Sequence, residues 1–173
     1  MKMLSINVLK GVKYVPETLV NKISSSNKHR LIDCRYIDVL YSPCWIFAFG
    51  AVFRFSQAKQ KFVGYLGGVD ELTLSPGTVT ALPETEEIKV MEKNVLSDKI
   101  TEARAEELAW EYSKRWVIRK NRILHKVPEK TQTHSYKVYK PLYLFEFYKK
   151  EEERTFYKIM DSLTGDLENI ELV

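Results

Sequence analysis

The sequence predicts an α+β fold of two similar units, each a helix packed on an antiparallel sheet of aromatic-rich hairpins. An aromatic hairpin pattern occurs twice. Pro43 opens an alternating run of aromatic residues that returns to Asp70, and Pro141 opens a second run that returns to Asp161. In addition, the segment from Ser97 to about Leu124 has the apolar spacing of an amphipathic helix. A repeat of this kind implies paired packing units.

The N-terminal unit is expected to span residues 1–82. It begins with a short helix over 16–23, because proline suits a first turn and the apolar residues after Pro16 share one face. Both faces of the strand after Pro43 are apolar, which predicts a strand covered on each side. The returning strand carries glycines at 64, 67 and 68, which indicate a bulge or a close backbone approach.

Residues 83–96 are expected to form a linker or connecting strand, and residues 97–173 the C-terminal unit. Ser97 is the candidate N-cap of its helix, with acids near the start and bases near the end, as the helix dipole favours. The predicted core stripe is Ala105, Leu108, Ala109, Tyr112 and Trp116. After a loop over 128–133, strands over 135–147 and 155–160 complete the unit.

Each hairpin is followed by residues typical of turns. The candidate turn-forming residues are Asp70, Gly77, Asp161 and Gly165. An aspartate side chain can cap such a turn, and a glycine can take the positive φ that it requires. A catalytic pair of carboxylates is the alternative for Asp70 and Asp161, but they sit in separate turns.

The C-terminal unit resembles the PepSY-type domain over residues 98–171. The resemblance rests on Ile100-Thr101-Glu102-Ala103, on Pro141-Leu142-Tyr143-Leu144-Phe145 and on the segment from Ile159 to Asp166. Residues 14–80 look like a diverged first copy, without a counterpart of the Ile-Thr-Glu-Ala helix start. The resemblance implies two cystatin-like units and a non-catalytic module that binds protein, sometimes restrains a peptidase, and commonly lies outside the cytoplasm.

Composition sets limits on compartment and partner. Because 27 Lys and Arg nearly balance 23 Asp and Glu, the net charge is +4, and binding a polyanion requires a local cluster. Two cysteines, Cys34 and Cys44, without closely spaced pairs favour a reduced intracellular protein. The longest apolar run is too short for a transmembrane segment. We expect a cytoplasmic location if residue 1 is the natural start, and an extracytoplasmic one if an upstream signal or anchor was removed.

No motif in the sequence predicts catalysis. Cys44 lies in an apolar strand, where the thiolate is disfavoured, and neither cysteine has a characteristic nucleophile sequence around it. No two Cys or His residues have the close spacing of a zinc site. The sequence therefore predicts no catalytic residue, no metal and no cofactor.

Two surfaces are candidates for binding. The aromatic residues exceed what one helix can cover, so part of them forms either the contact between units or a protein or peptide surface. The candidate partner surface is Tyr41, Trp45, Tyr65, Tyr143 and Tyr157. The candidate basic surface is Arg115, Arg119, Arg122 and Lys126. We expect a non-enzymatic protein-binding or regulatory protein; a nucleic-acid-binding protein is the alternative, and a small-ligand binder or unknown enzyme the third interpretation.

Overall fold

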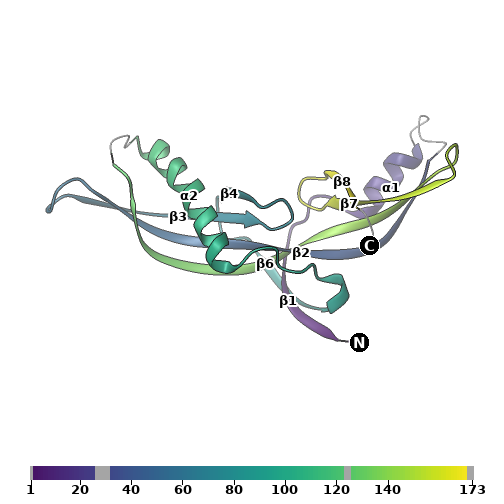
Figure 1. The fold of residues 1–173 in the computed structure, drawn as a ribbon, viewed down its shortest axis with the longest axis horizontal. Coiled ribbons are helices and arrows are strands. Elements are labelled where there is room, and N and C mark those ends of the chain that lie inside the picture. The colour runs from purple at the N-terminus through teal and green to yellow at the C-terminus, as the bar shows by residue number, and fades with distance from the viewer. Residues whose placement is uncertain (1, 26–31, 123–125, 171–173) are drawn as a thin grey trace. The chain divides into compact units, whose positions relative to one another are not determined.

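The computed structural model describes residues 2–25, 32–122 and 126–170, and these form an α+β fold (Figure 1). Its helices are α1 (Pro16–Ser25), α2 (Glu102–Asn121) and the short 3₁₀ helix η2 (Glu92–Asn94). Its strands are β1 (Met3–Leu9), β2 (Ile32–Arg54), β3 (Gln60–Asp70), β4 (Ser75–Val79), β5 (Thr85–Met91), β6 (Glu129–Lys149), β7 (Arg154–Asp161) and β8 (Leu167–Ile170). The helix over 16–23 and the two hairpins were predicted, but the fold contains more strand than the sequence pattern indicated.

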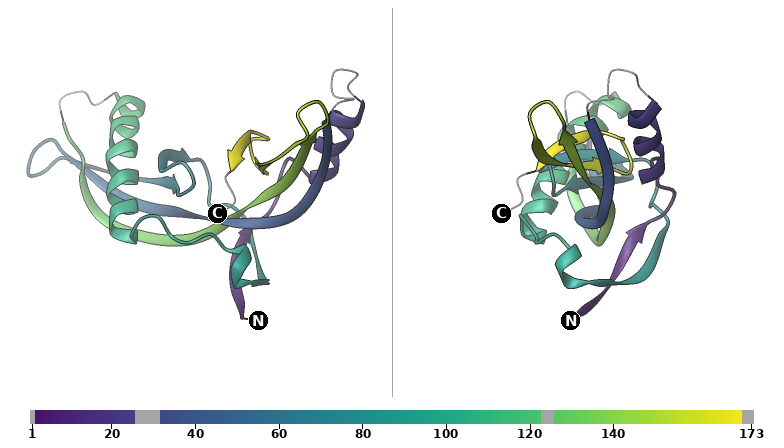
Figure 2. Two further views of the ribbon diagram at one scale, coloured as in Figure 1. Left: turned by 45° about the vertical axis from the view of Figure 1, so that its right-hand side comes forward. Right: turned by 90° about the vertical axis from the view of Figure 1, so that its right-hand side faces the viewer.

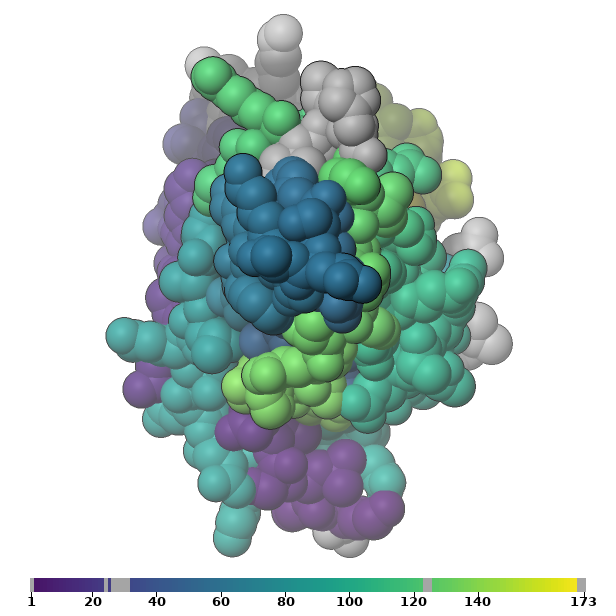
Figure 3. Space-filling model, turned by 90° about the vertical axis from the view of Figure 1, so that its left-hand side faces the viewer, coloured from purple at the N-terminus to yellow at the C-terminus, as the bar shows by residue number. Residues whose placement is uncertain are grey.

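The strands belong to one mixed sheet with the order β4-β3-β2-β6-β1-β5, and β7 and β8 continue from β6. Most neighbours are antiparallel, whereas β1 meets β6 in parallel at Val8 and Tyr139. β2 and β6 are the longest strands and lie side by side (Figure 1), and Figure 3 shows the β2–β3 hairpin in blue next to the start of β6 in green. The segment expected to be a loop at 128–133 therefore mostly belongs to β6.

The chain divides into two compact units that interleave along the sequence. Unit 1 comprises Met1–Ser42, Thr85–Leu96 and Tyr139–Val173, and unit 2 comprises Pro43–Glu84 and Ser97–Val138. This differs from the predicted division into 1–82, 83–96 and 97–173. The physical reason is that β2 and β6 each contribute residues to both units, whereas a simple repeat would confine each strand to one unit. Each hairpin thus packs with the helix from the other half of the chain.

Unit 2 has α2 packed on the β2–β3–β4 hairpins (Figure 2). Its buried cluster combines aromatic residues of β2 with alanines of the helix: Trp45, Phe47, Phe49, Val69, Ala105 and Ala109. The helix begins at the N-cap Thr101, whose side chain accepts a hydrogen bond from the Arg104 amide, so Ser97 is not the cap. The buried carboxylate of Glu71 accepts hydrogen bonds from Trp45 Nε1 and from the amides that precede the helix.

The buried face of α2 is shifted relative to the predicted stripe. The helix buries Ala105, Ala109, Ser113 and Val117. Tyr112 and Trp116 were predicted to lie in the core but are 47% and 38% exposed. The reason lies in β3: a Cβ on Gly67 would stand 2.5 Å from Ser113 Oγ and 3.3 Å from the Ala109 carbonyl oxygen. Small residues face the strand because the helix approaches it so closely. This is the close backbone approach indicated by the glycines.

Unit 1 has α1 packed on the β6–β7 hairpin, and β8 pairs with β7. Phe145, Phe147 and Met160 form its buried cluster, against which α1 places its apolar face. A second cluster joins β1 and β5, with Ile6, Val8 and Val90 buried. The backbone carbonyl of Ser162 accepts hydrogen bonds from the amides of Lys13 and Tyr14, just before α1.

The two hairpins share register and turn geometry. Cys44 pairs with Asp70, the residue before the first turn, and Leu142 pairs in the same way with Asp161. Each aspartate accepts a hydrogen bond from the amide two residues later, at 2.9 and 2.8 Å, which confirms their predicted turn-capping role.

The positive φ of each turn falls four residues after its aspartate, at Leu74 (55°) and at Gly165 (78°). The assignment for Gly165 is confirmed. The one for Gly77 is wrong, because Gly77 lies inside β4, opposite Gly68. Glycine was expected to mark the turn of unit 2, but the chain places a leucine there.

Candidate functional site

The exposed side of the C-terminal half of α2 carries the most distinctive surface of unit 2. Helical spacing places four residues on it, and the C-cap residue Arg122 follows them; we call the five the arginine–aromatic face: Tyr112, Arg115, Trp116, Arg119 and Arg122. All five side chains are exposed. The shift of the buried stripe to Ser113 and Val117 produces this face, since the two large aromatic residues then turn outward.

The three arginines of this face are not neutralised by neighbouring acids. Three acids on α2 contact other cations: Glu106 pairs with Lys130, Glu107 with Arg104 and Glu111 with Lys114. Within the part of the chain that the structure describes, no ion pair involves the three arginines. Arg122 also ends the helix, in the left-handed conformation with φ 54°. The face therefore combines unneutralised positive charge with apolar rings.

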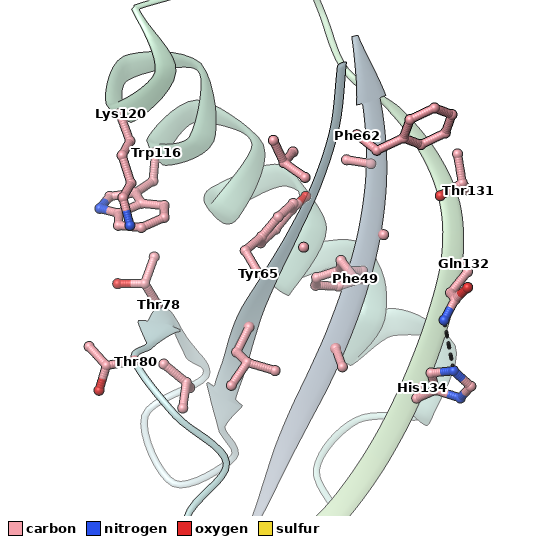
Figure 4. A pocket seen from close by; sticks show the side chains of 17 residues that line it. Phe49, Phe62, Tyr65, Thr78, Thr80, Trp116, Lys120, Thr131, Gln132 and His134 are labelled. Carbon is pink, nitrogen blue, oxygen red and sulfur yellow. Dashed lines mark hydrogen bonds between the residues drawn. The ribbon is translucent and has the colours of Figure 1, made fainter. Parts of the chain in front are cut away.

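Lys120 adds a further positive charge beside this face. Its Nζ lies over the Trp116 ring, 4.5 Å from the centroid. Both residues border a hollow of about 860 Å³, across which Thr78 and Thr80 of the β4 end lie (Figure 4). The predicted Lys126 is exposed as well, beyond the C-terminus of the helix.

The hollow is not one enclosed binding pocket. Its lining takes five successive residues of β3, from Phe62 to Leu66, whose side chains alternate between the two faces of the sheet. Gln132 and His134 line it from β6, on the other side of β2 from Trp116 (Figure 4). Their side-chain nitrogens lie 3.0 Å apart. The hollow therefore wraps around a strand, and we assign it no ligand.

Tyr65 is the one polar group in this hollow that lacks a hydrogen-bond partner within the described ranges while its hydroxyl is buried. Burial raises the pKa of this phenol, and the nearby Glu111 carboxylate raises it further. The phenol consequently stays protonated at neutral pH and is a hydrogen-bond donor rather than a base.

The predicted partner surface is not gathered on one exposed face. Trp45 and Tyr65 belong to unit 2, whereas Tyr41, Tyr143 and Tyr157 belong to unit 1. None of the five is fully exposed, and Trp45 is 9% exposed with its indole nitrogen bonded to Glu71. The predicted basic surface, in contrast, is exposed as expected. Sequence reasoning missed Tyr112 and Trp116 as surface residues, although their position beside the arginines on a helical wheel was a usable signal.

The described residues contain no cluster suited to a metal ion, and the Cys34 thiol is not activated. Nowhere in residues 2–25, 32–122 and 126–170 do three His, Cys, Asp or Glu side chains gather as they would around a metal ion. Burial raises the pKa of the Cys34 thiol to about 11, which disfavours the reactive thiolate. Asp70 and Asp161 lie in different units. No helix of the described chain has the length and apolar character needed to cross a bilayer.

Comparison with protein-family models, with curated proteins and with solved structures finds no match to this chain.

Proposed function

We propose that this is a non-enzymatic binding protein whose arginine–aromatic face captures an acidic segment of a partner protein. The observation that carries the proposal is the exposure of Tyr112 and Trp116 beside three arginines without ion pairs within the described chain. Tyrosine, tryptophan and arginine are the residue types that contribute most to protein interfaces. A helix packed on a hairpin in each unit also supports the cystatin-like, PepSY-like arrangement that we include in the proposal.

The chemistry of the face defines the partner. Guanidinium groups bind carboxylates with two parallel hydrogen bonds, so Asp or Glu residues of the partner would pair with Arg115 and Arg119. The indole and phenol rings would cover an apolar side chain between those acids. The expected ligand is therefore an extended or helical segment with acids flanking a large apolar residue.

Single-stranded nucleic acid is the second candidate for the same face. Its phosphates would contact the arginines, and a base would stack on the free side of the Trp116 ring, since Lys120 lies over the other. Glu107 and Glu111 do not separate the two candidates, because they pair with Arg104 and Lys114 and would act alike on either anionic ligand. Nucleic acid is disfavoured because a protein that binds its phosphate backbone needs a longer row of cations than one helix end provides.

Peptide selection tests the proposal directly. We expect selection from a random peptide library to yield sequences with acids around an apolar residue. Trp116→Ala should weaken the affinity for these peptides about tenfold or more. The triple reversal of Arg115, Arg119 and Arg122 to Glu should abolish binding. The matched control reverses three exposed lysines of unit 1, Lys10, Lys89 and Lys93, and should leave binding intact.

A labelled oligonucleotide decides between the two candidates. If the wild type binds it with an affinity that falls steeply with salt, and the arginine reversal flattens that slope by about one unit per lost phosphate contact, the nucleic-acid function replaces the protein-binding one. Selected peptides without acids, or peptides that bind the reversed variant equally well, would refute the proposal.

A further inference from the structure

Unit 1 contains a second cavity, of about 350 Å³, between α1 and the sheet. Its lining comes from α1, from β2 and from the three strands that α1 covers: Leu19, Lys22, Ile23, Ile32, Phe147, Phe156, Lys158 and Leu167. Six of these side chains are apolar. The other two are lysines, one from the helix and one from β7. The cavity volume is at the lower end of the range found for small-molecule sites.

Lys158 occupies an unusual position for a lysine. It lies between Phe156 and Met160 on alternate positions of β7, and thus on the face that packs against α1. Its Nζ lies 6.0 Å from the ring centroid of Phe147 and 5.9 Å from that of Phe156. The side chain is half-buried, and no carboxylate in the described chain pairs with it or with Lys22.

The corresponding place in unit 2 shows what this lysine changes. Lys158 pairs across the hairpin with Phe145, as Gly67 pairs with Phe47. At Gly67 the helix α2 approaches so closely that even a Cβ would collide with it, and the space is filled. At Lys158 a long charged side chain stands under α1, and a cavity remains beside it.

We propose that this cavity binds an amphipathic carboxylate, a fatty-acid-like molecule with its chain against the phenylalanines and its carboxylate between Lys22 and Lys158. The apolar lining gains nothing from water, whereas a hydrocarbon chain would cover it. Lys22 is exposed and Lys158 half-buried, and neither pairs with a carboxylate of the described chain, so an anionic headgroup on the solvent side of the cavity would meet positive charge from both. This inference concerns unit 1 and is independent of the function proposed for α2.

Calorimetric titration of the full chain tests it, with saturated straight-chain carboxylates and the alcohols of equal chain length as probes. We expect saturable binding of one carboxylate per chain, at least about tenfold tighter than that of the matched alcohol. Lys22→Met and Lys158→Met keep the side-chain stem and remove the charge. Each should weaken carboxylate binding about tenfold and leave the alcohol unchanged, whereas Lys89→Met on β5, exposed in the same unit, should change neither.

A stability measurement separates binding from a structural role of the lysine. If Lys158 only covers apolar surface with its stem, Lys158→Met should leave both binding and the melting temperature unchanged, which would refute the proposal. A second variant, Ile23→Trp, fills the cavity and should abolish binding of acid and alcohol alike. Equal affinity for acid and alcohol in the wild type, or no saturable binding, would likewise overturn the assignment.

Discussion

Gly67 is the position where the fold of unit 2 is most sensitive to one added carbon. In Gly67→Ala, the new Cβ would stand 2.5 Å from Ser113 Oγ, 3.2 Å from Phe49 Cε2 and 3.3 Å from the Ala109 carbonyl oxygen. Overpacking of this kind costs roughly 1–3 kcal/mol. The loss of glycine's freedom in the unfolded chain returns about 0.4–1 kcal/mol. The midpoints of the two ranges give a net destabilisation of about 1.3 kcal/mol.

Denaturant unfolding followed by tryptophan fluorescence measures this difference. Gly64→Ala is the matched control on the same strand, since the nearest atom to its added Cβ is a carbonyl oxygen at 4.0 Å, and it should be neutral or slightly stabilising. Ser113→Ala removes the closest atom together with a buried hydroxyl that lacks a partner in the described chain. The double variant should recover part of the loss. An equal effect of the two glycine substitutions would refute the close approach of α2 to β3.

Three further predictions concern core and thiol residues. Glu71→Ala should destabilise the protein by about 3–5 kcal/mol in thermal unfolding, because Trp45 Nε1 and the Lys99 and Ile100 amides lose a buried acceptor, and Glu71→Gln should cost less. Phe145→Ala should cost about 3–5 kcal/mol and Trp116→Ala well under 2 kcal/mol, and equal losses in chemical unfolding would contradict the outward position of Trp116. With its pKa raised to about 11, Cys34 should be alkylated slowly at pH 8 in a Cys44→Ala background and faster as the pH rises, and mass spectrometry of an unfolded control gives the reference rate.

The sequence could predict those structural features that depend on residues close together along the chain. The register of each hairpin, the capping aspartates and the helix after Pro16 follow from local patterns, and the structure contains them. The prediction of α2's buried face failed because apolar periodicity assigns large residues to the core. Here the glycine of β3 leaves room for helix backbone instead, and the small Ala109 and Ser113 fill it.

The residues of the candidate site divide in the same way, into those that local patterns predict and those that depend on contacts between distant segments. Charge and spacing identified the arginines of α2 from the sequence, because a helical surface is a local property. The aromatic partner surface could not be predicted, since whether Trp45 is exposed depends on which helix covers β2. That choice is made by segments far apart in the chain: Glu71 binds the amides before α2, and the Ser162 carbonyl binds those before α1.

Each hairpin packs against the helix from the other half of the chain, and this predicts how the protein behaves when the chain is cut. Cleavage between Leu82 and Pro83, in the segment between β4 and β5, gives fragments 1–82 and 83–173. If each half formed its own unit, both fragments would fold alone as monomers. Because each unit combines residues of both fragments, we expect neither to unfold cooperatively alone, while an equimolar mixture forms a 1:1 complex. Circular dichroism and size-exclusion chromatography distinguish these results, and a cooperatively folded monomer of either fragment would show that its helix can cover its own hairpin.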